Sequence, residues 1–138
     1  MAYTPPWRLF GLVSPREARL AFGLILLAIT VIALIPGHVG GVNLLGWDKL
    51  NHIAAFAALA LLARAGWPNA RRTTVFIGLM VFGLAIELAQ TLSFIHRAFS
   101  MYDWAADAIG ICLGLIAAWL GAQILIRTPF LFRPAADE

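Results

Sequence analysis

The sequence predicts an all-α fold: a polytopic integral membrane protein built as a bundle of four transmembrane helices. The 138-residue chain is 62% hydrophobic and 12% charged, with a mean hydropathy of +0.86. A soluble domain is nearer half apolar and a quarter charged. The apolar residues also gather in four runs near the length of about 20 residues that crosses a bilayer. The composition therefore argues against a water-soluble enzyme, a disordered chain or a nucleic-acid-binding domain, and no nucleic-acid partner is expected.

The first two predicted helices are separated by an uncharged, glycine-rich connection. No charged residue occurs between Arg19 and Asp48, and Pro36 interrupts the first apolar run. This run is longer than the apolar core of a signal peptide, and no clear small-x-small cleavage site follows it. An uncleaved helix is therefore expected. The second run opens with polar side chains and continues as an alanine- and leucine-rich segment to Gly66.

The third and fourth predicted helices each contain one acidic residue well inside an apolar run, Glu87 and Asp107. A basic hairpin precedes the third helix, and a turn at 97–100 precedes the fourth. Backbone polar groups in lipid must be satisfied within a segment, which requires helices, and short connections make neighbouring helices antiparallel. One domain over residues 1–138 is predicted, with helices at about 18–36, 47–66, 73–96 and 101–126.

The distribution of basic residues predicts the orientation. Eight Lys and Arg residues flank the apolar runs on one side of the predicted membrane and two on the other. Positive residues stay in the cytoplasm, so both termini and the middle hairpin are predicted to be cytoplasmic. The eight are Arg8, Arg16, Arg19, Arg64, Arg71, Arg72, Arg127 and Arg133, and the two are Lys49 and Arg97.

Ionisable residues inside membrane helices cost about 2.5–3.5 kcal/mol each on insertion scales, so those retained here are candidates for a site. Asp48 and His52 are four apart and share a helix face, as do Glu87 and Gln90, three apart. We expect these side chains to converge near the outer face of the membrane. The predicted polar pocket consists of Asp48, Lys49, His52, Glu87, Gln90, Arg97, Asp103 and Asp107.

Simpler interpretations remain open for several of these residues. Asp48 can cap the second helix, and Ser100 with Asp103 fits a capping box for the fourth. Gly110 and Gly114 form a small-xxx-small motif that favours close helix packing, either within the bundle or between two copies of the chain.

Glu87 and Asp107 are the hardest to explain structurally, because they cap none of the predicted helices. Glu87 precedes the predicted helix end at His96 by nine residues, which places it about 13 Å deep along the axis, near mid-bilayer. We expect Arg97 to be its central partner, with Asp103 and His52 orienting the pair.

The predicted pocket carries excess negative charge. Its four carboxylates face two cations, a net charge of −2 with His52 neutral. A protonated carboxyl, a charged His52 or a bound cationic group would each restore balance. The sequence does not choose among these three, and no resident metal or cofactor is predicted from it.

These residues also carry a family resemblance. Three motifs and one arginine follow one another along the chain: Asp48-Lys49-x-x-His52, Glu87-x-x-Gln90, Arg97 and Asp103-x-x-x-Asp107-x-x-Gly110-x-x-x-Gly114. Their order and spacing resemble those of the VanZ-like family of small membrane proteins. Asp107 departs from the Asn expected in many members. The family is named for a protein associated with resistance to the glycopeptide teicoplanin. The resemblance implies a cell-envelope role in a bacterial inner membrane.

Three functions remain open at this point. The pocket can bind a membrane lipid or a cell-wall-related molecule, which is the reading that the resemblance favours. The carboxylates and His52 can serve a membrane-embedded enzyme, although no catalytic signature such as HExxH or GxSxG is present. The polar residues can instead act structurally by tying the helices together.

Overall fold

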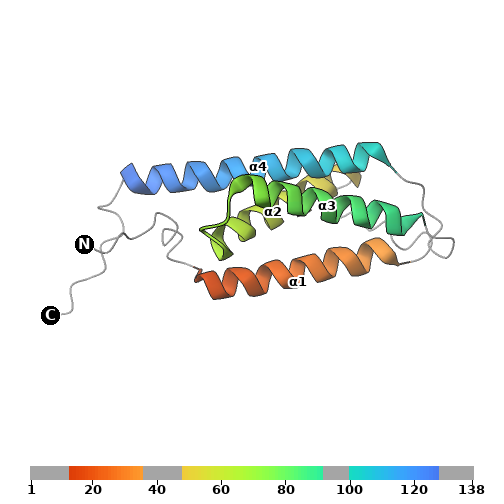
Figure 1. Cartoon of the computed structure of the whole chain (residues 1–138), viewed down its shortest axis with the longest axis horizontal. Coiled ribbons are helices and arrows are strands. Elements are labelled where there is room, and N and C mark those ends of the chain that lie inside the picture. Colours follow the sequence, from red (N-terminus) through yellow and green to blue (C-terminus); the bar gives the residue numbers. More distant parts are fainter. Residues whose placement is uncertain (1–12, 36–47, 92–99, 128–138) are drawn as a thin grey trace.

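The computed structural model describes residues 13–35, 48–91 and 100–127, and over these ranges the regular structure is entirely helical. The helices lie side by side and alternate in direction (Figure 1). The start of α1, the α2–α3 hairpin and the end of α4 therefore lie at one end of the bundle. The helices are α1 (Pro15–Leu34), α2 (Asp48–Gly66), α3 (Arg72–Gln90) and α4 (Met101–Arg127).

Helix α2 lies in the middle of the bundle and packs against the other three helices. Its Phe56, Leu59 and Ala60 are buried and form the core with Leu79 of α3 and Ile111 of α4. Aromatic and aliphatic side chains of α1 pack against this cluster from the other side. A helix enclosed by protein can carry polar residues at one end, because they face neighbouring helices.

The other three helices are long and apolar enough to cross a membrane. On α1 the large exposed side chains Leu20, Leu24, Leu27 and Val31 recur every three or four residues and form one apolar face. Helices α3 and α4 expose similar rows of Ile, Leu and Val. An apolar surface this extensive suits lipid as the surrounding solvent.

Helix α1 begins three residues earlier than predicted. Ser14 accepts from the backbone N–H of Glu17 at 3.3 Å, and the Glu17 carboxylate accepts from the backbone N–H of Ser14 at 2.6 Å. Together with Pro15 in the first turn, this capping box starts the helix ahead of its apolar run. The Ser-Pro-Arg-Glu sequence was the available signal.

Helix α3 ends at Gln90, six residues before the predicted end at His96. Thr91 terminates it, and its backbone N–H bonds back to Leu88 at 3.2 Å. Glu87 therefore lies in the last turn of α3, about 4.5 Å along the axis from the helix end. The expected distance of about 13 Å between Glu87 and the helix end is therefore wrong, because an apolar run does not by itself show where a helix stops.

Candidate functional site

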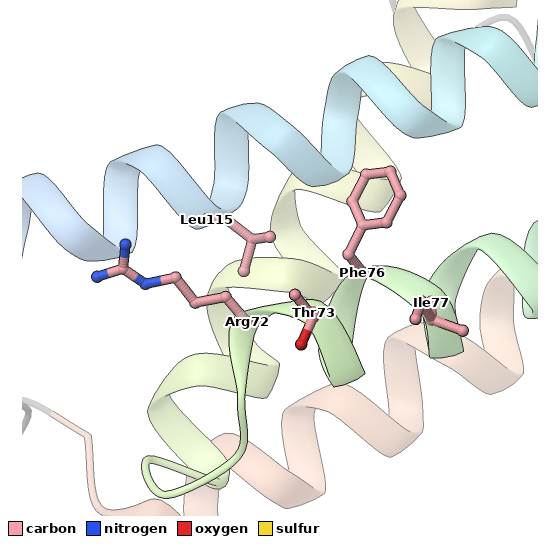
Figure 2. A pocket seen from close by; sticks show the side chains of 5 residues that line it. All are labelled: Arg72, Thr73, Phe76, Ile77 and Leu115. Atoms are coloured by element: carbon pink, nitrogen blue, oxygen red, sulfur yellow. The ribbon is translucent and has the colours of Figure 1, made fainter.

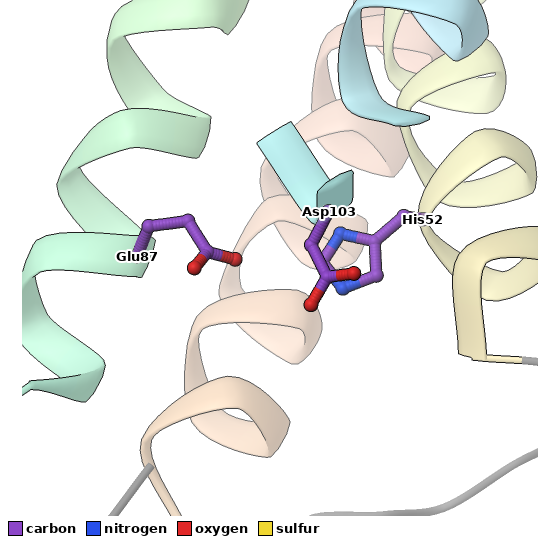
Figure 3. A group of neighbouring side chains, drawn as sticks. All are labelled: His52, Glu87 and Asp103. Carbon is purple, nitrogen blue, oxygen red and sulfur yellow. The ribbon is translucent and has the colours of Figure 1, made fainter. Parts of the chain in front are cut away.

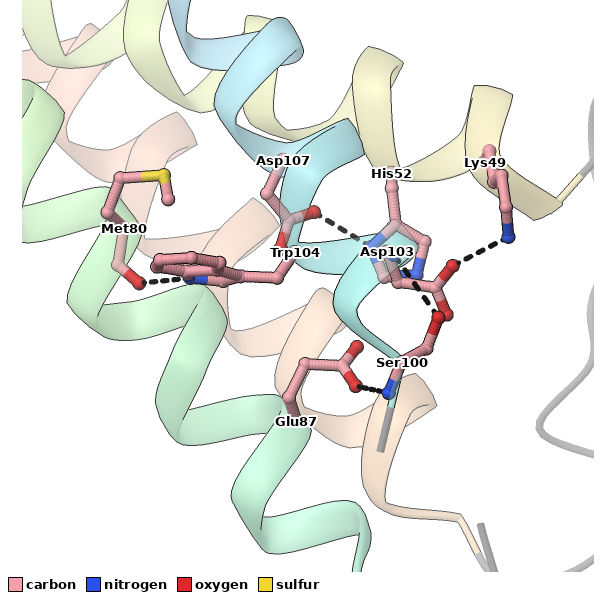
Figure 4. A network of polar contacts seen from close by, with 8 residues as sticks. All are labelled: Lys49, His52, Met80, Glu87, Ser100, Asp103, Trp104 and Asp107. Carbon is pink, nitrogen blue, oxygen red and sulfur yellow. Dashed lines mark hydrogen bonds and ion pairs between the residues drawn. The ribbon is translucent and has the colours of Figure 1, made fainter. Parts of the chain in front are cut away.

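The predicted polar residues of α2 and α4 meet as two side-chain pairs, shown in Figure 4. Lys49 Nζ lies 2.9 Å from Asp103 Oδ1, and His52 Nδ1 lies 2.8 Å from Asp107 Oδ1. The residues are three apart on α2 and four apart on α4, so both pairs lie along one contact between the helices. Asp107 is 1% exposed, whereas the Lys49 side chain is 34% exposed. The pairs therefore run from a partly open entrance to a closed interior.

Three glycines allow the helices to approach this closely. A Cβ on Gly110 would collide with the backbone of Ile53, and one on Gly114 would collide with the backbone of Ala57, both on α2. A Cβ on Gly83 of α3 would lie 2.6 Å from Asp107 Oδ2. Gly110 and Gly114 thus pack within the bundle, against α2, and the approach they permit brings Asp103 and Asp107 to their partners on α2.

Glu87 joins α3 to the start of α4 rather than to a basic side chain. Its Oε2 accepts from the backbone N–H of Ser100 at 2.9 Å, and the Ser100 hydroxyl accepts from the Asp103 N–H at 3.2 Å. Ser100 thus behaves as the N-cap of α4. In an ordinary capping box the side chain three residues on would accept the Ser100 N–H. Here Glu87 takes that place, so the expectation that it caps nothing is wrong.

The second oxygen of Glu87 is the one unsatisfied polar side-chain atom among the buried groups of residues 13–35, 48–91 and 100–127. Glu87 is 1% exposed, so bulk water does not compensate Oε1. A buried acceptor without a partner costs about 1–3 kcal/mol, and more if it is charged. Such a cost makes this oxygen the strongest indication of a ligand in the cluster.

Two further bonds hold α3 beside this cluster. Gln90 Nε2 donates to the carbonyl of Ala33 on α1 at 3.1 Å. Trp104 Nε1 donates to the carbonyl of Met80 at 3.2 Å. Gln90 therefore lies beside the polar pocket as a link to α1. The Trp104 contact was not anticipated, because nothing in the sequence shows which carbonyl an indole N–H will find.

Two predicted pocket members cannot be placed. Arg97 lies outside the described residues, as does the side chain of Asp48. The expected Glu87–Arg97 pair and the orienting roles given to Asp103 and His52 around it therefore remain predictions. Among the placed members, three carboxylates face one ammonium, a net charge of −2 with His52 neutral.

His52, Glu87 and Asp103 are the described residues whose donor atoms could hold a metal ion, since one such atom from each lies within 4.8 Å of the others. A separate apolar groove of about 370 Å³ lies near the opposite end of α3 (Figure 2). Its walls come from α3 and α4, and it includes no predicted pocket residue. It is lined by Arg72, Thr73, Phe76, Ile77 and Leu115.

Comparison of the chain with protein-family models, curated proteins and solved structures finds no match. The resemblance to the VanZ-like family therefore rests on the ordered motifs alone.

Proposed function

We propose that this chain is a VanZ-like protein of the bacterial plasma membrane, and that its polar cluster binds the head group of a lipid or of a cell-envelope precursor. It crosses the membrane four times with both termini in the cytoplasm. Helix α2 supplies the fourth span: it has 19 residues, as α3 has, and runs antiparallel to its neighbours in the bundle. The polar cluster then faces outward, at the end of the bundle opposite the basic hairpin.

The observation that carries this proposal is the unsatisfied Oε1 of Glu87 at the closed end of a cluster that is partly open at Lys49. A bound head group reaching this oxygen would satisfy it. The net charge of −2 favours a ligand that brings positive charge with it, as an amine or as a phosphate with a counter-ion. Polar groups converging in an otherwise apolar molecule are typical of ligand sites.

Native mass spectrometry of the detergent-purified protein tests this proposal. We expect retained lipid or precursor on the wild type, and its loss in Glu87→Gln, which keeps the side-chain volume but removes the charge. Arg72→Gln is the matched control, because it alters the groove at the other end of α3. Loss of the ligand in Arg72→Gln with retention in Glu87→Gln would overturn the assignment of the head group to the polar cluster.

The orientation can be tested separately by cysteine labelling. Ser100→Cys, in a Cys112→Ser background, is expected to react with an impermeant maleimide in intact cells. Trp67→Cys in the α2–α3 hairpin is expected to react only after the cells are permeabilised. The reverse pattern would invert the topology and place the cluster at the cytoplasmic face.

A structural role is the second candidate, because the bonds of the cluster join different helices. Lys49 and His52 tie α2 to α4, and Glu87 ties α3 to α4. Such a role predicts that cluster variants lose thermal stability without loss of a ligand. Stable variants that lose an envelope phenotype would exclude it.

A further inference from the structure

Three side chains of metal-ligating type converge from three different helices: His52 from α2, Glu87 from α3 and Asp103 from α4. Figure 3 shows the Glu87 carboxylate pointing toward the other two. One donor atom of each lies within 4.8 Å of the others. Two ligands of one tetrahedral Zn²⁺ ion are about 3.3–3.6 Å apart, since each bond is about 2.0–2.2 Å. Side-chain movements of roughly an ångström, shared among the three residues, would bring their donor atoms to ligand distance.

His52 is oriented as metal-bound histidines usually are. Its Nδ1 lies 2.8 Å from Asp107 Oδ1, and Asp107 is buried beside Gly83, where a Cβ would lie only 2.6 Å from Asp107 Oδ2. In metal sites one ring nitrogen binds the ion, while the other donates to a carboxylate that fixes the tautomer and the ring orientation. With Nδ1 directed to Asp107, Nε2 is the nitrogen assigned to the ion.

The charge and the unsatisfied oxygen supply a second, independent indication. Glu87 Oε1 is buried and has no hydrogen-bond partner within the described ranges, while Oε2 is already used by the Ser100 N–H. The placed members of the cluster carry a net charge of −2 with His52 neutral. A divalent cation would neutralise that charge and satisfy Oε1 in one step.

The Lys49 ammonium opposes a cation at this position. It occupies Asp103 Oδ1 at 2.9 Å, which leaves Oδ2 as the ligand atom of Asp103. A like charge this close weakens binding of the ion. Removal of Lys49 should therefore tighten metal binding, which is the opposite of what general damage to the fold would do.

We propose that His52 Nε2, Glu87 Oε1 and Asp103 Oδ2 form a site for a divalent first-row transition metal, with Asp107 orienting His52. One imidazole with two carboxylates suits Mn²⁺ or Zn²⁺, since imidazole favours the later metals and carboxylates accept the harder ones. The site uses three protein ligands and leaves coordination positions for water or a ligand. It does not depend on the head-group proposal, because the ion alone accounts for the charge and the unsatisfied oxygen.

Mn²⁺ is the probe for the test. The full-length protein is purified in detergent, stripped with chelator and titrated with Mn²⁺, with bound ion read by electron paramagnetic resonance. We expect one equivalent, with a ¹⁴N coupling from the His52 ring in pulsed spectra. His52→Gln should remove the coupling, and His52→Gln and Glu87→Gln should each weaken binding at least tenfold. Glu17→Gln, in the α1 capping box, is the control and should bind as the wild type does.

The proposal fails if the wild type binds no stoichiometric Mn²⁺ or Zn²⁺, a result that requires no variant to fold. It also fails if binding survives unchanged in both His52→Gln and Glu87→Gln. Lys49→Met should bind Mn²⁺ several-fold more tightly than the wild type, and weaker binding would contradict the geometry assigned here. Mn²⁺ binding by a protein that retains no lipid would refute the head-group proposal and leave this one standing.

Discussion

The two ends of the bundle hold their charged side chains in different ways. At the hairpin end, Arg19 Nε donates to the carbonyl of Gly66 at 2.7 Å, and its guanidinium lies 5.6 Å from the centroid of the Trp67 ring. Arg64 donates to the carbonyl of Ala70 in the same hairpin. At the other end, Asp103 and Asp107 bond to side chains of another helix.

The difference follows from what each end has to satisfy. Arg19 and Arg64 are long cationic side chains that reach carbonyls at the end of α2 and in the hairpin, while keeping their charge near water. At the polar end, Glu87 and Asp107 are each 1% exposed. Their charges cannot reach water and depend on particular partners. The hairpin end should therefore tolerate substitution, whereas the two buried carboxylates of the polar end should not.

The largest effect is expected from Asp107→Ala. Removing the buried carboxylate takes away the partner of His52 Nδ1 and leaves a cavity, which together cost about 3–5 kcal/mol of the free energy of unfolding. Arg64→Ala, at the hairpin end, should cost about 1 kcal/mol, because the freed carbonyl can bind water. Denaturant titrations in micelles measure both. Equal losses would remove the contrast between the two ends.

The second-largest effect is expected from Gly110→Ala, which should lower the free energy of unfolding by about 1–3 kcal/mol, because the new Cβ would meet the rigid backbone of Ile53. At the hairpin end, a Cβ on Gly66 would lie 2.9 Å from Cγ and 3.2 Å from the backbone N of Arg19, a looser contact than a Cβ on Gly110 would make with the Ile53 carbonyl. Gly66→Ala should therefore cost less. Gly78→Ala is the control, since nothing lies within 4 Å of its Cβ position. A Gly110→Ala protein as stable as Gly78→Ala would show that α2 and α4 are not in close contact. Thermal unfolding followed by gel filtration ranks the three.

Arg19→Lys sharpens the description of the hairpin end. Lysine keeps the charge but loses the Nε hydrogen bond to Gly66 and the planar stacking on Trp67. A loss of about 0.5–1 kcal/mol is expected, by the usual value of a cation–π contact at an exposed site. Denaturant titration followed by tryptophan fluorescence measures it. If Arg19→Lys is as stable as the wild type, the positive charge at this position is sufficient, and neither the hydrogen bond to Gly66 nor the stacking on Trp67 contributes to stability.

Lys49→Met should have the smallest effect, about 0.5 kcal/mol. Its ion pair with Asp103 is at the partly exposed entrance of the cluster, where such pairs contribute little. The same titration checks the value. A loss comparable to that of Asp107→Ala would mean that the entrance is as closed as the interior, and the described gradient of burial would not hold.

The sequence predicted the helices well and their ends less well. Apolar runs located all four helices because helix formation in such segments depends on local composition. The start of α1 was missed, although Ser14 and Glu17 carried a readable capping signal. The end of α3 could not be read, since the apolar run continues past Thr91 and the helix stops within it.

The candidate site was predicted as a set of residues but not as a set of contacts. Helical spacing put Asp103 and Asp107 on one face, and the cost of burying charge marked Glu87 as exceptional. The pairing of Glu87 with the Ser100 backbone was not readable, because a peptide N–H is present at nearly every residue. Nor could Gly110 be assigned to contacts within the bundle, since a small-residue motif serves both kinds of interface.

The sequence by itself determined that this chain forms apolar helices and retains acidic, basic and imidazole groups near one end of them, since composition and periodicity are local properties. Only the tertiary structure decided which group faces which. The separation between helices depends on whether Gly83, Gly110 and Gly114 admit a neighbouring helix, and that depends on side chains more than twenty residues away. The buried oxygen of Glu87 follows from the same packing: three helices close around it, and its one placed partner satisfies only the other oxygen of the carboxylate.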